Sequence, residues 1–85
     1  MKTLNPRVIS VTPEPGYHLL LTFTNGEVKR FDMHPYLSKG VFSELQNEAM
    51  FNTAKPAMGT VMWANGLDLC PDTLYLEAVA VPARA

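Results

Sequence analysis

The chain has 85 residues, 47% hydrophobic and 18% charged, so it has room for one domain, residues 1–85, and the composition of a packed globular protein rather than a disordered one. A formal charge of −1, with basic residues scattered along the chain, disfavours direct nucleic-acid binding. The single Cys70 excludes an internal disulfide, and the first residues lack a signal-peptide core, so we expect a cytoplasmic protein. No apolar run approaches the roughly 20 residues that span a bilayer, so we expect no membrane segment.

Alternating apolar residues predict two strands before residue 24. In residues 7–12, Ile9 and Val11 share one face, and a second period-two run covers residues 17–23. The Pro-rich residues 12–16 between the runs predict a turn. The apolar face of the second strand is expected to consist of Tyr17, Leu19, Leu21 and Phe23.

Asn25 and Gly26 separate the second strand from a third one, residues 27–32. Both residue types tolerate the positive φ of a tight type I′ turn, so a hairpin is predicted here. Val28 and Phe31 fall on opposite faces of the third strand. This break in the alternation predicts either a bulge or a strand that is covered on both sides.

The next segment, residues 35–54, changes to apolar spacings of three and four, which predicts short helices interrupted near Gly40. Pro56 is expected to end this helical stretch. A strand is predicted over residues 58–64, because aliphatic and aromatic side chains alternate there.

Asn65 and Gly66 repeat the hairpin signal and would join residues 58–64 to a short strand over residues 67–69. Pro71 and Asp72 suit the first turn of a last helix, which Pro82 would end. The fold class is therefore α+β, in the order β-β-β-α-β-β-α. We expect a small antiparallel sheet of two hairpin-containing units with short helices packed on it.

One motif in residues 63–74 is specific enough to indicate a family. Together with residues 8–11, 24–27 and 31–32, it makes residues 6–79 resemble the bacterial family known as domain of unknown function 2442. The resemblance implies the same β-β-β-α-β-β-α order and supplies no catalytic residues. The motif consists of Trp63, Asn65, Gly66, Asp68, Pro71, Asp72 and Leu74.

The resemblance also implies two kinds of biological context. Some relatives resemble the N-terminal half of longer chains with a helix-turn-helix DNA-binding region, and others resemble the smaller member of a two-gene pair suspected to be a toxin and an antitoxin. The chain ends at Ala85, so we expect no such DNA-binding region here. An interaction or regulatory module is what the resemblance leaves as the expectation.

A few side chains are candidates for chemistry. Asp32 could orient the His34 imidazole for acid–base work, with Tyr36 nearby, although His34 also suits a plain turn before a proline. His18 is expected on the exposed face of its strand. Cys70 precedes a helix, where a thiol can be activated, but an inert thiol is the preferred interpretation.

No metal ion and no cofactor are expected, because the sequence has neither the Cys and His spacings of a zinc site nor a glycine-rich phosphate loop. Asp68 and Asp72 are interpreted as capping residues rather than a catalytic pair. Trp63 is expected in the core. Met58 and Met62, together with Met33, could mark a recognition surface, since methionine is common in interface cores.

The first functional hypothesis is a non-catalytic protein-interaction or regulatory module, a homodimer or the partner of another small protein such as the antitoxin-like member of a two-gene pair. The second is a small-ligand or enzyme site at His34, in which Asp32, His34 and Tyr36 line one pocket. The third is transcription regulation through a DNA-binding partner, which predicts a basic patch of Lys29, Arg30 and Lys39.

Overall fold

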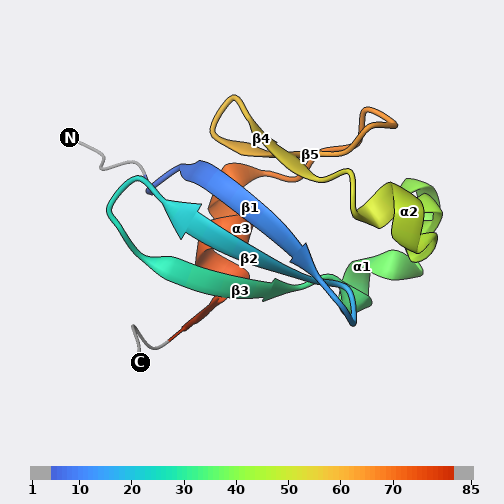
Figure 1. Ribbon diagram of the computed structural model, residues 1–85, viewed down its shortest axis with the longest axis horizontal. Coiled ribbons are helices and arrows are strands. Elements are labelled where there is room, and N and C mark those ends of the chain that lie inside the picture. The colour runs from blue at the N-terminus through green and yellow to red at the C-terminus, as the bar shows by residue number, and fades with distance from the viewer. Residues whose placement is uncertain (1–4, 82–85) are drawn as a thin grey trace.

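A three-stranded antiparallel sheet forms the centre of the structure, a computed structural model that describes residues 5–81 (Figure 1). A short fourth strand extends it in the order β1-β2-β3-β6. The strands are β1 (Val8–Glu14), β2 (His18–Phe23), β3 (Val28–Asp32) and β6 (Val79–Ala80).

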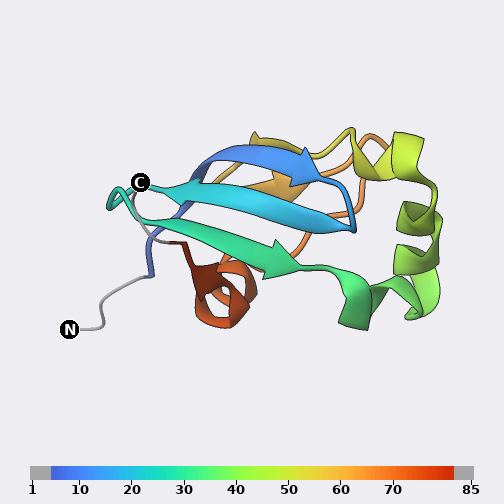
Figure 2. The ribbon, with the colours of Figure 1, turned by 60° about the horizontal axis from the view of Figure 1, so that its bottom comes forward.

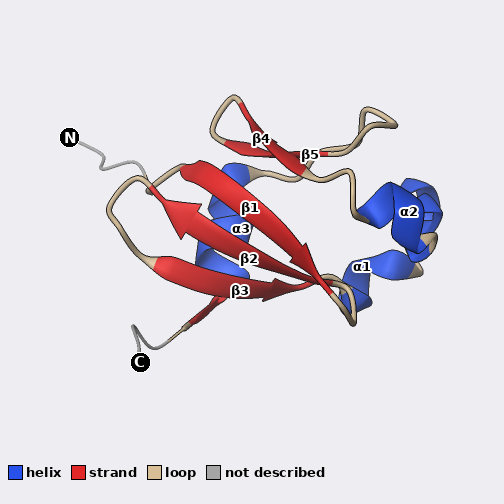
Figure 3. Ribbon diagram, viewed as in Figure 1, coloured by secondary structure: helices blue, strands red, loops and turns tan. Residues whose placement is uncertain are grey.

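The chain between β3 and β6 forms the helices and a small two-stranded sheet, which are arranged around the main sheet (Figure 3). Short helices gather at the end of the sheet where β3 ends, a two-stranded sheet runs alongside β1, and a last helix crosses one face of the main sheet (Figure 2). These elements are α1 (His34–Leu37), the 3₁₀ helix η1 (Gly40–Gln46), α2 (Glu48–Phe51), β4 (Lys55–Ala57), β5 (Thr60–Met62) and α3 (Pro71–Glu77). The α+β prediction is confirmed. No helix within residues 5–81 has both the length and the apolar character needed to cross a membrane.

The hydrophobic core lies between the main sheet, α3 and the β4–β5 hairpin. Alternate residues of β2 point into it, because successive side chains of a strand face opposite sides. The Trp63 indole is 1% exposed and donates a hydrogen bond to the Phe51 carbonyl oxygen at 3.0 Å. The largest fully buried side chains are Trp63, Phe23, Phe31, Phe51, Leu19, Leu21, Met33, Leu45, Leu74 and Val61.

The other face of the main sheet, here called the outer face, carries the polar residues of the same strands. Glu14 pairs with His18 across β1 and β2, and His18 pairs with Asp32 across β2 and β3. The three side chains therefore form one row at the end of the sheet nearest α1. The next row consists of Thr12, Leu20, Arg30 and Val79.

Both Asn-Gly sites form hairpin-like reversals, but the predicted type I′ geometry is wrong at both. Each is a type I turn closed by a glycine in the left-handed region, Gly26 or Gly66, both with φ of 89°. The Asn25 and Asn65 side chains accept the backbone N–H of the residue two positions on, at 3.0 and 3.1 Å. Asparagine therefore acts through its side chain, and glycine alone supplies the positive φ.

Replacing Gly66 with alanine is expected to lower the free energy of unfolding by about 1–2 kcal/mol, the usual penalty for an L-residue in the left-handed region. No heavy atom lies within 4 Å of the added methyl group at Gly66 or Gly26, so the cost is conformational. Gly26→Ala is therefore expected to match Gly66→Ala in urea unfolding. Two unequal losses, or no loss at either site, would contradict the shared turn geometry.

A type I′ turn does occur, at Met58 and Gly59, between the paired residues Ala57 and Thr60. The strand expected over residues 58–64 is therefore corrected to β4 and β5, which reverse at residue 58. Pro56 lies within β4 rather than directly ending a helix, because α2 already stops at Phe51. Alternating apolar residues do not reveal where a strand reverses, and methionine is a poor turn signal.

Three further details differ from the predictions. The irregular pairing lies in β1 between Val8 and Ser10, not in the third strand, so Val8 is buried while Ile9 is 56% exposed. The strand expected at residues 67–69 is reduced to one bridge between Met62 and Asp68. The last helix ends at Glu77 and continues into β6. Pro82, expected to end it, lies outside the described residues.

Candidate functional site

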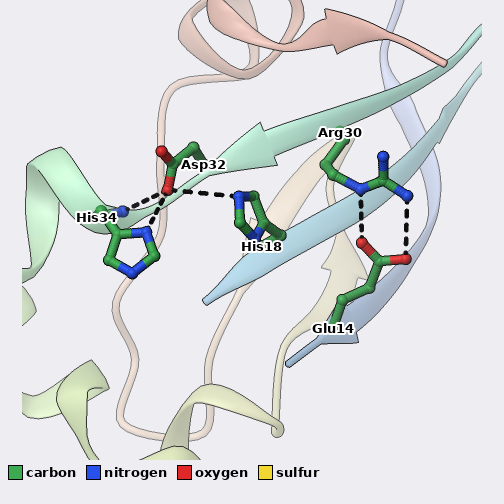
Figure 4. Close-up of polar contacts among 5 residues, drawn as sticks. All are labelled: Glu14, His18, Arg30, Asp32 and His34. Carbon is green, nitrogen blue, oxygen red and sulfur yellow. Dashed lines mark hydrogen bonds and ion pairs between the residues drawn. The ribbon is translucent and has the colours of Figure 1, made fainter. Parts of the chain in front are cut away.

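Two histidines and one aspartate meet at the end of the outer face (Figure 4). His18 is the first residue of β2 and Asp32 the last residue of β3, and the antiparallel register places them side by side. His34 begins α1 two residues later, so the chain turns its imidazole back toward Asp32. We call these three residues the His-Asp-His cluster.

A single carboxylate oxygen holds the His-Asp-His cluster together. Asp32 Oδ1 lies 2.7 Å from Nδ1 of His34 and also accepts the backbone N–H of His34 at 2.9 Å. The Nε2 atom of His18 lies 3.8 Å from the same oxygen. The side chains remain accessible, with exposed fractions of 33% for His18, 53% for Asp32 and 55% for His34.

Neighbouring aromatic rings fix the orientation of His34. Tyr17 and His18 each meet its imidazole edge-on, with ring centroids 5.8 Å apart in both pairs. The Tyr17 hydroxyl is itself anchored, because it donates a hydrogen bond to the Gln46 carbonyl oxygen. The cluster is therefore supported from the strand side and from the helical segment.

Asp32 is held in its ionised form. Partial burial is the strongest single influence and raises the pKa of its carboxyl, but the hydrogen bonds from the backbone and ring of His34, with the positive charges of His34 and His18 when protonated, outweigh it. The pKa of Asp32 is therefore lowered from its ordinary value. At neutral pH, Asp32 is therefore a carboxylate, and it faces the rings of His18 and His34.

A Glu14–Arg30 ion pair lies next to the cluster on the outer face. Arg30 Nε and Nη2 reach the two Glu14 carboxylate oxygens at 2.7 and 3.4 Å. The hydrogen bond from Arg30 lowers the pKa of Glu14, and the charges of Arg30 and His18 add to this against a smaller effect of burial. The Arg30 charge is thus largely balanced by its own partner.

A hollow of about 330 Å³ adjoins the cluster. Its polar wall is formed by His18, Asp32 and Arg30, and its apolar wall by residues 79–81 after α3. The hollow gives small molecules and ions access to one side of the cluster.

Tyr36, expected beside Asp32 and His34, lies elsewhere. Its ring stacks on Phe31 with centroids 5.7 Å apart, and its hydroxyl donates to Glu77 Oε1 at 2.5 Å. This hydrogen bond, with burial and the charge of Glu77, raises the pKa of the Tyr36 hydroxyl. The structure therefore brings Asp32 and His34 together with His18 rather than with Tyr36.

The proposed recognition methionines are also dispersed. Met58 is 90% exposed at the tip of the β4–β5 hairpin, whereas Met62 is half-buried in β5. Met33 is fully buried in the core and contributes nothing to a surface.

The three cations expected in a basic patch do not share one face of the main sheet. Lys29 donates to the Tyr75 carbonyl oxygen at 3.0 Å and lies over the Tyr75 ring. Arg30, the next residue along the strand, is on the opposite face with Glu14, and Lys39 lies near the Tyr36 ring. The structure therefore does not bring Lys29, Arg30 and Lys39 together in the predicted patch.

The sequence motif at residues 63–74 has structural roles. Trp63 and Leu74 are core residues, and Asn65 and Gly66 form the second glycine-closed turn. Pro71 opens α3, which also has Asp72 in its first turn, and Asp68 makes the bridge to Met62. Cys70 is a free, exposed thiol at the N-cap of α3.

Comparison with known proteins agrees with the motif. The family model described as protein of unknown function (DUF2442) matches residues 8–80. Neither the curated proteins nor the solved structures contain a match. The family model covers all the described strands and helices, from β1 to β6. The chain therefore belongs to the family described as protein of unknown function, DUF2442.

Proposed function

We propose that the protein is a cytoplasmic, non-catalytic interaction module with a regulatory role, and that Met58 is its main contact residue. The observation that carries the proposal is the state of this side chain. Met58 is 90% exposed and has a φ of 53°, in the left-handed region that non-glycine residues seldom adopt. Asparagine or glycine would occupy this turn position at lower free energy.

Strain of this kind supports a functional role for the side chain. A residue in a sparsely populated backbone conformation costs about 1–3 kcal/mol and is found preferentially at functional sites. Methionine is flexible and polarisable, which suits it to contacts with an apolar partner surface. Folding gains little from this methionine, because nearly all of its side chain is in water.

A second exposed apolar residue lies beside the hairpin tip. The backbone N–H of Val8 donates to the Gly59 carbonyl oxygen at 2.9 Å. Ile9 follows Val8 in the chain and Met58 precedes Gly59, so the two exposed residues each adjoin a member of this hydrogen-bonded pair. Ile9 is 56% exposed. The Arg7 side chain packs across Gly59 and adds a positive charge to this apolar surface. We call Met58, Ile9 and Arg7 the hairpin-tip surface.

A second copy of this chain is the proposed partner of the hairpin-tip surface. Small domains bury a limited share of their chain, and covering exposed apolar residues in a dimer adds to their stability. The alternative partner is the other small protein of a two-gene pair, with this chain as its antitoxin-like member. Both partners use the same surface, so the same substitution tests them.

Replacing Met58 with asparagine is expected to raise the free energy of unfolding by about 1 kcal/mol, since asparagine tolerates the left-handed region. The same variant is expected to shift the monomer–dimer equilibrium toward monomer in sedimentation equilibrium. Val41→Asn is the matched control, because Val41 is 62% exposed but lies in η1. It should leave association unchanged.

The outcomes separate the two partners. If the wild-type chain stays monomeric at millimolar concentration, the homodimer is overturned. Binding of the neighbouring gene product is then measured with wild type, Met58→Asn and Val41→Asn. Equal association by wild type and Met58→Asn overturns the role of the hairpin-tip surface.

A second candidate function, a small-ligand or enzyme site near His34, is favoured by one observation. The His-Asp-His cluster borders a hollow of about 330 Å³. A ligand there would meet His18 and Asp32 rather than the originally expected Tyr36.

A further inference from the structure

We propose that the His-Asp-His cluster binds one divalent transition-metal ion of the zinc class through His18 Nε2, an Asp32 carboxylate oxygen and His34 Nδ1. This site is separate from the hairpin-tip surface and does not depend on it. The proposal departs from the sequence-based expectation of no metal site, which considered only ligand spacings along the chain.

The donor atoms are already grouped at the scale of a coordination sphere. One ligand atom from each residue lies within 4.8 Å of the other two. Zinc bonds of about 2.0–2.2 Å in tetrahedral geometry place ligands about 3.3–3.6 Å apart. The observed 3.8 Å from His18 Nε2 to Asp32 Oδ1 and 2.7 Å from His34 Nδ1 to Asp32 Oδ1 lie on either side of this range. Small side-chain rotations, with release to solvent of the Nδ1 proton that His34 donates to Asp32, would therefore complete the site.

The chemistry of the donors selects the class of metal. Two imidazole nitrogens and one carboxylate oxygen suit zinc, copper, nickel or cobalt, whereas calcium and magnesium prefer oxygen ligands alone. Arg30 lines the same hollow as His18 and Asp32, and its pairing with Glu14 limits its repulsion of a bound cation.

The fold holds the ligands while leaving one side open. His18 and Asp32 are neighbours in the β2–β3 ladder, and the Tyr17 ring supports His34. His18 and Asp32 also line the adjoining hollow, which provides an entry path. Three protein ligands leave further coordination positions for water or a small ligand.

A simpler explanation covers only part of the cluster. Asp32 Oδ1 accepts the backbone N–H of His34. This hydrogen bond forms a local turn at the start of α1, and such a turn needs no metal. That turn does not involve His18, which approaches from another strand. His18 is therefore the residue that distinguishes a metal site from a turn.

The test is a titration of tag-free chain with Zn²⁺ against a chromophoric indicator, repeated with Co²⁺ to record its ligand-field spectrum. One equivalent of metal is expected to bind. His18→Gln and Asp32→Asn are each expected to weaken binding by at least the roughly 10- to 100-fold that loss of an outer-shell partner costs. Cys70→Ser is the matched control and should bind like wild type, because the thiol lies at the N-cap of α3.

A measurement on the wild-type chain guards against misfolded variants. Zinc is expected to shift the ¹⁵N resonances of His18 Nε2 and His34 Nδ1, while circular dichroism confirms that each variant is folded. Binding that Cys70→Ser abolishes, or that His18→Gln leaves unchanged, overturns the proposal. Absence of stoichiometric binding, or zinc-induced shifts at other histidine nitrogens only, overturns it as well.

Discussion

Replacing Trp63 with alanine is expected to lower the free energy of unfolding by about 3–5 kcal/mol, the usual cost of removing a large aromatic side chain from a core. Trp63 is 1% exposed, and its indole N–H satisfies the Phe51 carbonyl oxygen. A chain of this length has a total stability of about 4–13 kcal/mol, so the loss is a large share of it. Urea unfolding followed by circular dichroism measures the change.

The control for this substitution is Leu76→Ala, which also removes a large apolar side chain but from a position that is 67% exposed. It should change the urea midpoint little. If Trp63→Ala cost no more than Leu76→Ala, the indole would not be a central part of the core. That result would also contradict the assignment of a structural role to the motif that begins at Trp63.

Replacing Thr60 with valine is expected to cost about 1–3 kcal/mol, because it leaves a buried carbonyl oxygen without its donor. The Thr60 hydroxyl donates to the Leu69 carbonyl oxygen at 2.5 Å, and the two residues are only 7% and 8% exposed. Valine has nearly the same shape, so packing is preserved. In thermal unfolding, each kcal/mol corresponds to about 4–8 °C for a domain of this size.

Thr22→Val provides the comparison for Thr60→Val. Thr22 lies on the outer face of β2, opposite Ser10 and Val28, and is half-buried. Its substitution should be close to neutral, since valine suits a strand. A loss at Thr22 equal to that at Thr60 would assign the effect to the strand position rather than to the hydrogen bond.

The sequence predicted the α+β class and the main strands because their signals are local. Leu19, Leu21 and Phe23 alternate without interruption, and all three are fully buried. Gly26 and Gly66 marked two chain reversals for the same reason. The reversal at Met58 was missed, since a methionine in the left-handed region is stabilised by the surrounding pairing and not by its own preference.

The candidate site was only half predicted, and the cause is the turn type. A two-residue turn at Asn25 and Gly26 pairs the strands so that His18 faces Met33. The glycine-closed turn adds one residue to the loop and shifts the register by one, so that His18 faces Asp32. The choice between these two turns therefore decides whether the second histidine joins the cluster. The Asn-Gly pattern is compatible with both turns and does not distinguish them.

The pairing at the two margins of the main sheet has a consequence for how the protein can assemble. At one margin, β6 pairs with β3 over two residues, and the Val81 N–H then donates to the Val28 carbonyl oxygen. At the other margin, formed by β1, the Val8 N–H donates to the Gly59 carbonyl oxygen, and Pro13 has no N–H to donate. Within residues 5–81, a neighbouring molecule thus finds no long stretch of free backbone donors and acceptors at either margin of the main sheet on which to add a strand. Addition of strands at these margins is therefore disfavoured, and we expect association of copies to depend on side chains, which a single substitution can tune.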